Sequence, residues 1–182
     1  MTRLELFDKI FPFCEQNQIC LQHAAPPGFG WIYDPETVKK VITAWKEGTL
    51  ESYNFETKNK NGKYYQISSP TRLGVVAHRN NQVGFFVIDL DDHDKVKNTR
   101  FAEALPRFFQ TNPIFFTSKS SKGIHQFYFL ENSVPVKDFL DWARSWGFNR
   151  PGRPELFPKG EKLSQLWLPN DPNEKGGDCN VV

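Results

Sequence analysis

Two aspartates, Asp89 and Asp91, stand at the end of the apolar run "GFFVIDLD" (84–91). Successive side chains of a β-strand point to opposite faces, so residues two apart share a face. Asp89 and Asp91 therefore project together, while Ile88 and Leu90 face the core. Carboxylates held side by side repel each other unless a cation neutralises them. Hard oxygen ligands of this kind favour Mg²⁺ or Mn²⁺.

From residue 84 onward, strand-like and helix-like segments alternate regularly. Strands are predicted at 84–91, 113–118, 124–130 and 154–158, and helices at 95–109 and 136–148. This β-α-β-β-α-β order is that of the ferredoxin-like or RRM-like unit, in which the strands lie in the order 4-1-3-2. The end of the first strand then lies against the beginnings of the third and fourth strands.

That topology brings a histidine and a third carboxylate to the aspartates. His125 begins the third strand and Glu155 begins the fourth. We predict a catalytic, metal-binding cluster of Asp89, Asp91 and Glu155, with His125 beside it. Such a cluster suits a two-metal site of Mg²⁺ or Mn²⁺ that stabilises an in-line displacement at phosphate. The alternative is that these are ordinary exposed acids at strand ends, and the agreement of three separate segments disfavours it.

The first part of the chain predicts a smaller αβ module. A helix is expected over 3–17, a loop at "HAAPPGFGW", and a second helix that Asp34 caps and Gly48 ends. A turn at Asn61-Gly62 separates two strand-like segments, and a strand "RLGVVAH" and a turn "RNNQ" follow. We expect one α+β domain over 1–182, with an N-terminal module (1–68) packed on an RRM-like catalytic module (69–182).

The loop "TSKSSKG" leads directly into His125 and is dense in hydrogen-bond donors. Backbone amides, hydroxyls and ammonium groups in a turn suit phosphate oxygens. A histidine at the start of the strand can donate to the same phosphates. A solvated hairpin loop with a capping histidine is the alternative, but a hairpin has no use for so many donors.

These segments together resemble the archaeo-eukaryotic primase superfamily, in particular the prokaryotic primase-polymerases. Its Asp-x-Asp strand matches "FFVIDLD", its Ser-x-His-type motif matches "SSKGIHQFYF", and its acid before Phe-Pro-Lys matches "PELFPK". The later "LWLPNDPNEKGG" resembles a Leu-Pro segment found beyond the third motif. Each motif alone is weak, but their order and spacing over 84–170 are more specific. The resemblance implies an active site in the cleft between the two modules.

The resemblance also implies residue roles. Asp89, Asp91 and Glu155 would hold the metals, and Lys159 would lie near the nucleotide or template. Phosphates of the incoming nucleotide would be bound by the motif residues Ser121, Lys122, Gly123 and His125. The family places its small residue two before the histidine, which is Gly123 here, whereas Ser121 lies four before. Whether Ser120, Ser121 or the Gly123 amide makes the contact therefore stays open.

The implied activity is that of a DNA primase/polymerase, a template-directed nucleotidyltransferase. It would join a (d)NTP to a primer 3′-hydroxyl or a first nucleotide on a single-stranded DNA template. A metal-dependent nuclease or phosphodiesterase could use the same acids, and ribo- versus deoxynucleotide preference is open. A third alternative is an RRM-like single-strand binder without catalysis, in which Phe127 and Phe129 would be candidates for stacking.

Other short motifs are weaker candidates. His93-Asp94 with His78 resembles an HD-type phosphohydrolase motif, but these histidines flank a strand instead of lying on helices. Cys14, Cys20 and His23 offer three zinc ligands, yet their spacing is unusual for structural zinc. We therefore predict no zinc and interpret His93-Asp94 as a bystander.

Composition bounds the remaining properties. The 182 residues include 17 Phe and 5 Trp, enough for a real core, and the formal net charge is +2. Nucleic acid would be held by a basic rim drawn from 58–63, Lys119, Lys122, Arg144, Arg150 and Arg153. Three cysteines favour a reducing cytoplasm, and no signal peptide or membrane span is evident. We expect a monomer, either a stand-alone core or part of a longer protein that includes a helicase or accessory priming domain.

Overall fold

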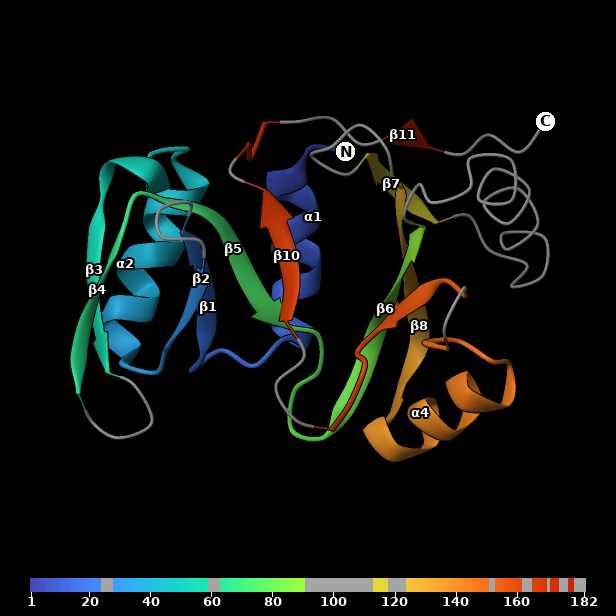
Figure 1. Ribbon diagram of the computed structural model, residues 1–182. Helices are drawn as coiled ribbons and strands as arrows, with labels where there is room; N and C mark the ends of the chain where they lie inside the picture. The colour runs from blue at the N-terminus through green and yellow to red at the C-terminus, as the bar shows by residue number, and fades with distance from the viewer. Residues whose placement is uncertain are drawn as a thin grey trace. The chain divides into compact units, whose positions relative to one another are not determined.

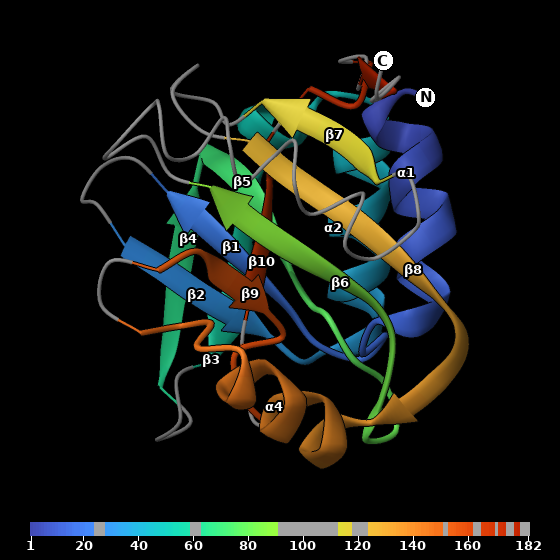
Figure 2. The same cartoon turned by 90° about the vertical axis from the view of Figure 1, so that its right-hand side faces the viewer.

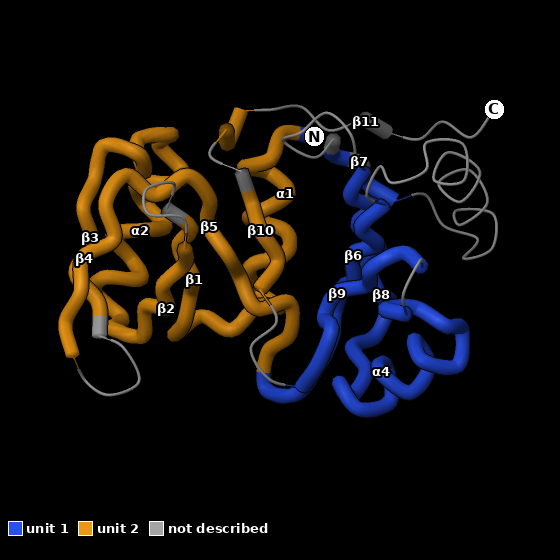
Figure 3. The backbone as a smooth tube through the Cα atoms, viewed as in Figure 1, with its two compact units in different colours: residues 1, 80–164, 175–182 blue, residues 2–79, 165–174 orange. Residues whose placement is uncertain are grey.

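The computed structural model of the protein describes residues 1–23, 28–58, 63–90, 113–117, 124–150, 153–161, 165–169, 171–173 and 177–178. It is a mixed α+β structure (Figure 1). The chain divides into two compact units (Figure 3). Unit 1 comprises residues 1, 80–164 and 175–182, and unit 2 comprises residues 2–79 and 165–174. No helix within the described ranges is long and apolar enough to cross a membrane.

Unit 1 is built on a five-stranded antiparallel sheet with one described helix. Its elements are β6 (Gln82–Leu90), β7 (Ile114–Thr117), β8 (Ile124–Pro135), α4 (Val136–Ser145), β9 (Glu155–Phe157) and β11 (Gly177–Asp178). The strand order is β11-β7-β8-β6-β9, and Figure 2 shows β7, β8, β6 and β9 side by side. Read from β9, this is the expected 4-1-3-2 order with β11 added at the far edge. The expected helix at 95–109 lies outside the described residues.

One face of this sheet packs against α4. Phe86 of β6 stacks on Tyr128 of β8, with ring centroids 4.9 Å apart, and lies 5.7 Å from the ring of Phe139 on α4. The buried cluster also includes Val83, Ile88, Leu90, Val136, Leu140, Ala143 and Leu156. Because apolar side chains alternate toward this face along β6, the polar Asp89 is directed to the other face.

Unit 2 contains a four-stranded antiparallel sheet, a separate hairpin and two α-helices. Its sheet strands are β1 (Ile19–His23), β2 (Gly28–Ile32), β5 (Pro70–Val76) and β10 (Gln165–Pro169), in the order β10-β5-β1-β2. Strands β3 (Asn54–Lys58) and β4 (Tyr64–Ser68) pair as the expected hairpin. The helical segments are α1 (Arg3–Ile10), η1 (Phe11–Phe13), α2 (Pro35–Lys46) and η2 (Leu50–Ser52), of which η1 and η2 are 3₁₀ turns.

Local signals fix the beginnings of both α-helices. Thr2 and Glu5 form a reciprocal capping box at α1, and Asp34 accepts a hydrogen bond of 2.8 Å from the Thr37 amide at α2. The expected helix over 3–17 was too long, since α1 ends at Ile10. Pro12 follows in η1, and proline removes an amide donor and clashes with a preceding carbonyl.

Three strands of unit 2 were not predicted. Strand β1 was unassigned, β2 begins inside the expected loop "HAAPPGFGW", and β10 lies at the Leu-Pro segment, for which no strand was predicted. Glycine weakens strand propensity, but at Gly30 it is required. A Cβ there would collide with the Tyr65 hydroxyl and with Ile67 of β4. The hairpin β3-β4 therefore approaches the sheet on the face where Gly30 lies.

The expected module boundary at residue 68 differs from the observed division. Strands β5 and β10 were assigned to the catalytic module, whereas both lie in unit 2 and pair with each other. The chain enters unit 1 at Asn80, inside the turn predicted at "RNNQ". Asn80 and Asn81 have φ of 50° and 60°, a left-handed conformation that asparagine tolerates better than most residues.

We expect His78 to make the fold less stable in acid. Its side chain is buried, and neither ring nitrogen has a hydrogen-bond partner among the described residues. Burial lowers the pKa of His78 below 6.5, against a smaller opposing effect of the Glu15 charge. The unfolded chain therefore binds the proton more tightly, so His78 contributes full stability above about pH 6.5, and that stability is lost as pH falls through the lowered pKa.

The measurement is the urea midpoint between pH 5 and 8 for the wild type and His78→Leu. The wild type should lose more stability below pH 6.5 than the variant does. Parallel pH profiles for the two proteins would contradict the assignment.

Candidate active site

Four residues form one row across the sheet of unit 1, on the face opposite α4. Asp89 of β6 lies directly opposite His125 of β8 on one side and Glu155 of β9 on the other. Phe116 of β7 lies opposite His125. Directly opposed residues in antiparallel strands project to the same face, with Cβ atoms about 5 Å apart. We call Glu155, Asp89, His125 and Phe116 the site row.

An apolar row lies beside the site row on the same face. It consists of Phe157, Val87, Phe127 and Ile114, which are all buried. Phe127 also packs edge-on against Phe116, with ring centroids 6.0 Å apart. The site row is therefore packed against this apolar row, which limits the positions that its polar side chains can take.

Asp89 and His125 approach each other within the site row. Asp89 Oδ1 lies 3.3 Å from His125 Nε2, and both side chains are about 85 % buried, with exposures of 15 % and 14 %. The two atoms are at ion-pair distance but do not form a hydrogen bond. Oδ1 is buried and has no hydrogen-bond partner in the described part of the chain. A buried carboxylate oxygen without a donor is costly. A cation or a donor bound at Oδ1 would remove that cost.

Glu155 forms an ion pair with Lys159. Lys159 Nζ lies 2.5 Å from Glu155 Oε2 and 4.5 Å from the centre of the Phe157 ring, so the ammonium stays on the face of the site row. Both charged side chains are more than one-third exposed. An exposed pair of this kind contributes only about 0–1 kcal/mol, so Lys159 can leave Glu155 at little cost. Lys159 thus lies beside Glu155, and its expected role near the nucleotide or template stays a prediction.

Asn149 holds strand β9 in place and was not predicted. Its side-chain amide donates to the Leu156 carbonyl at 3.2 Å, and its side-chain oxygen accepts from the Leu156 amide at 2.7 Å. Asn149 thus completes the outer edge of a three-residue strand as a neighbouring strand would. Its φ of 60° places it in the left-handed region. The sequence signal was only an asparagine beyond a helix end, which indicates a turn but not its partner.

Several predicted site residues lie outside the described residues: Asp91, Lys119, Ser121, Lys122 and Gly123, as well as the bystander pair His93-Asp94. Arg150 and Arg153 are described, and both are exposed beyond the end of α4. Arg150 Nη2 donates to the Arg144 carbonyl at 3.3 Å. Their position precedes β9 by only a few residues, and their expected contact with nucleic acid stays a prediction.

The site row offers carboxylate oxygens, which are the ligand type that Mg²⁺ and Mn²⁺ prefer. Asp89 and Glu155 supply two carboxylates on one face, and within the described ranges Asp89 Oδ1 accepts no hydrogen bond. Among the described residues no group of three or more His, Cys, Asp or Glu side chains is arranged to hold a metal ion. The third expected ligand, Asp91, is not among them.

The cysteines of unit 2 are buried thiols. Burial raises the pKa of Cys20 to about 12 and also raises the pKa of Cys14, whose Sγ approaches the Ile10 carbonyl at 3.5 Å. Zinc and nucleophilic chemistry both use the thiolate, which this environment disfavours.

Neither a scan of the chain against protein-family models nor a search of curated proteins found a match.

Proposed function

We propose that the protein is a metal-dependent nucleotidyltransferase that extends a primer on a single-stranded DNA template. The observation that carries the proposal is the placement of Asp89, His125 and Glu155 at one register position of three adjacent strands. These residues belong to three sequence motifs that lie far apart in the chain. Among the residues that the structure describes, the buried Asp89 Oδ1 has no hydrogen-bond donor, and a purely structural row would have little reason to hold such an atom.

Asp89 and Glu155 are the residues that would hold Mg²⁺ or Mn²⁺, together with Asp91. When bound, such ions offset the negative charge of the triphosphate and of the leaving pyrophosphate. The protein contributes mainly position and charge, since phosphoryl and nucleotidyl transfer need little acid-base chemistry from side chains. The packed apolar row, which includes Phe127 and Val87, limits the positions that the Asp89 carboxylate can take.

His125 and Lys159 are suited to the phosphates of an incoming nucleotide. An imidazole N–H can donate to a phosphate oxygen, and His125 is next to the carboxylates. Lys159 provides a compact cation. Because its exposed ion pair with Glu155 is weak, the ammonium group can leave Glu155 and bind a phosphate instead. Both side chains would then bind the triphosphate, while the carboxylates bind its counter-ions.

The test is incubation of the full chain with a 5′-labelled primer-template, dNTPs and Mn²⁺. We expect products longer than the primer, which require both the metal and the template. Products shorter than the primer would instead support a nuclease, and an unchanged primer would contradict the proposal. Of the two rings that a non-catalytic strand binder would use, Phe127 is completely buried and offers no ring face to a base, whereas Phe129 is half-buried.

A further inference from the structure

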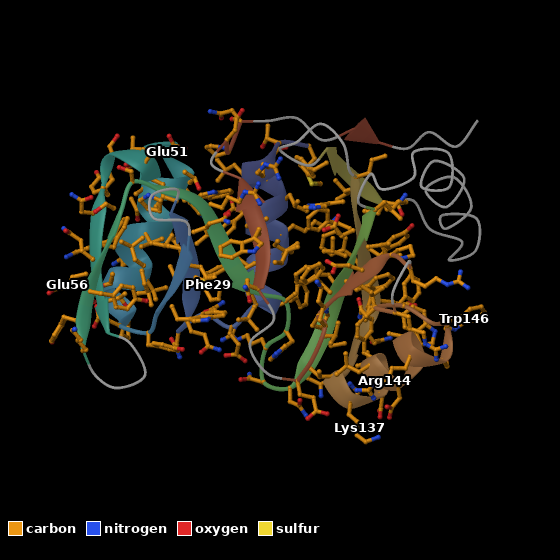
Figure 4. The ribbon with its side chains drawn as sticks, viewed as in Figure 1. Phe29, Glu51, Glu56, Lys137, Arg144 and Trp146 are labelled. Atoms are coloured by element: carbon orange, nitrogen blue, oxygen red, sulfur yellow. The ribbon has the colours of Figure 1, made fainter. Side chains whose placement is uncertain are left out.

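The four-stranded sheet of unit 2 carries an aromatic surface on the face away from hairpin β3-β4. Phe29 is 55 % exposed there, and its ring meets that of Trp167 edge-on at a centroid distance of 6.3 Å. Figure 4 shows Phe29 at this sheet. Trp31, two residues after Phe29 on β2, shares the face and is half-buried. We call Phe29, Trp31 and Trp167 the aromatic surface.

The two inner strands carry small residues on this face, which lets the aromatic rings of the outer strands approach each other. Trp167 of β10 and Trp31 of β2 are in one register row, with Gly74 and Cys20 between them on β5 and β1. A Cβ at Gly74 would lie 2.9 Å from Trp167 Cζ3. The Trp167 ring therefore leans across β5 over the glycine, toward Phe29. Gly74 is thus a structural requirement of this surface.

The polar residues of the same face are cationic or neutral. Arg72 of β5 and Gln22 of β1 lie in one register row with Phe29, and both are half-buried. Gln165 also lies on this face, at the start of β10. The described strand residues of this face include no Asp or Glu. A guanidinium beside an exposed ring and two half-buried ones complements a chain of phosphates and bases.

We propose that this face binds single-stranded nucleic acid by stacking bases on Phe29 and Trp167, with Arg72 on the backbone phosphate. Aromatic stacking is tolerant of sequence because every base has a π-face, and it requires unpaired bases. A template strand that must be copied whatever its sequence needs this kind of binding. The inference therefore rests on the proposed function and assigns it a template-binding surface.

The experiment is fluorescence anisotropy of a labelled oligothymidylate of about 12 nucleotides, within the usual site size of such surfaces. The full chain is titrated at low salt with EDTA and without nucleotides. Phe29→Ala should weaken binding by about 5- to 100-fold. Phe29→Leu should weaken it similarly because it keeps the apolar bulk but loses the π-face, whereas Phe29→Trp should retain binding. Arg72→Gln should lower the salt slope by about 0.7.

Phe13→Ala is the matched control, because Phe13 is an exposed phenylalanine of unit 2 that lies off the sheet, in η1. It should bind like the wild type, and circular dichroism should show all variants folded. Wild-type affinity in both Phe29→Ala and Phe29→Leu would overturn the proposal. So would equal affinity of the wild type for blunt duplex, or no binding at all. Since the assay contains no metal or nucleotide, its failure is distinct from a failure of primer extension.

Discussion

Asp89→Asn should reduce primer extension by about 10²- to 10³-fold while the protein remains folded. The substitution keeps the size of the side chain and removes its charge. Stabilisation of the transferring group by bound cations is worth several kcal/mol, and each 1.36 kcal/mol is tenfold in rate. The measurement is the initial rate of extension at saturating primer-template and Mn²⁺.

The same variant should be more stable than the wild type when no metal is present. Asp89 Oδ1 is buried without a hydrogen-bond partner among the residues described, and a neutral amide is less costly to bury than a carboxylate. We expect the free energy of unfolding to rise by about 1 kcal/mol. Mn²⁺ should raise the melting temperature of the wild type and leave that of Asp89→Asn nearly unchanged.

Asp138→Asn is the matched control because Asp138 is an exposed aspartate of α4 in the same unit. It should extend primers at the wild-type rate and respond to Mn²⁺ like the wild type. Full extension by Asp89→Asn would show that Asp89 does not take part in the chemistry. A loss of activity accompanied by a loss of stability would reduce Asp89 to a structural residue.

Phe127→Ala should cost about 3–5 kcal/mol of unfolding free energy. Phe127 is fully buried in the middle of the apolar row, between Val87 of β6 and Ile114 of β7. Removing its ring leaves a cavity beside the site row that neighbouring side chains fill only partly. Phe127→Leu, which keeps most of the volume, should cost less than about 1.5 kcal/mol.

Urea denaturation at neutral pH measures these changes. Phe29→Ala serves as the control for the Phe127 variant, because its ring is more than half exposed and the expected change is within about 0.5 kcal/mol. A loss of unfolding free energy below 1 kcal/mol for Phe127→Ala would show that the apolar row beside the site row is not tightly packed.

The strand order of unit 1 could be predicted because local patterns and topology agreed. The run at 84–88 is apolar on both faces, as a central strand requires, and short strand signals followed at regular spacing. Once the order 4-1-3-2 was assumed, the meeting of Asp89, His125 and Glu155 followed from geometry. The register pairs confirm that meeting.

Unit 2 was harder to predict because its sheet is assembled from distant segments. Strand β10 pairs with β5 across about ninety residues, and no local pattern reveals a partner so far away. Gly30 and Gly74 lower the strand signal, although close approaches by Tyr65 and Trp167 require them. The role of Asn149 was likewise invisible, since it depends on where the Leu156 backbone lies in space.

The most direct test of the central claim is anomalous diffraction from crystals soaked with Mn²⁺ and a non-hydrolysable dNTP. We predict anomalous peaks within about 2.5 Å of carboxylate oxygens of Asp89 and Glu155. The triphosphate should lie at the same place, with an oxygen in hydrogen-bond range of His125. Manganese bound elsewhere, with Asp89 and Glu155 free of metal and nucleotide, would contradict the assignment of this row as the active site.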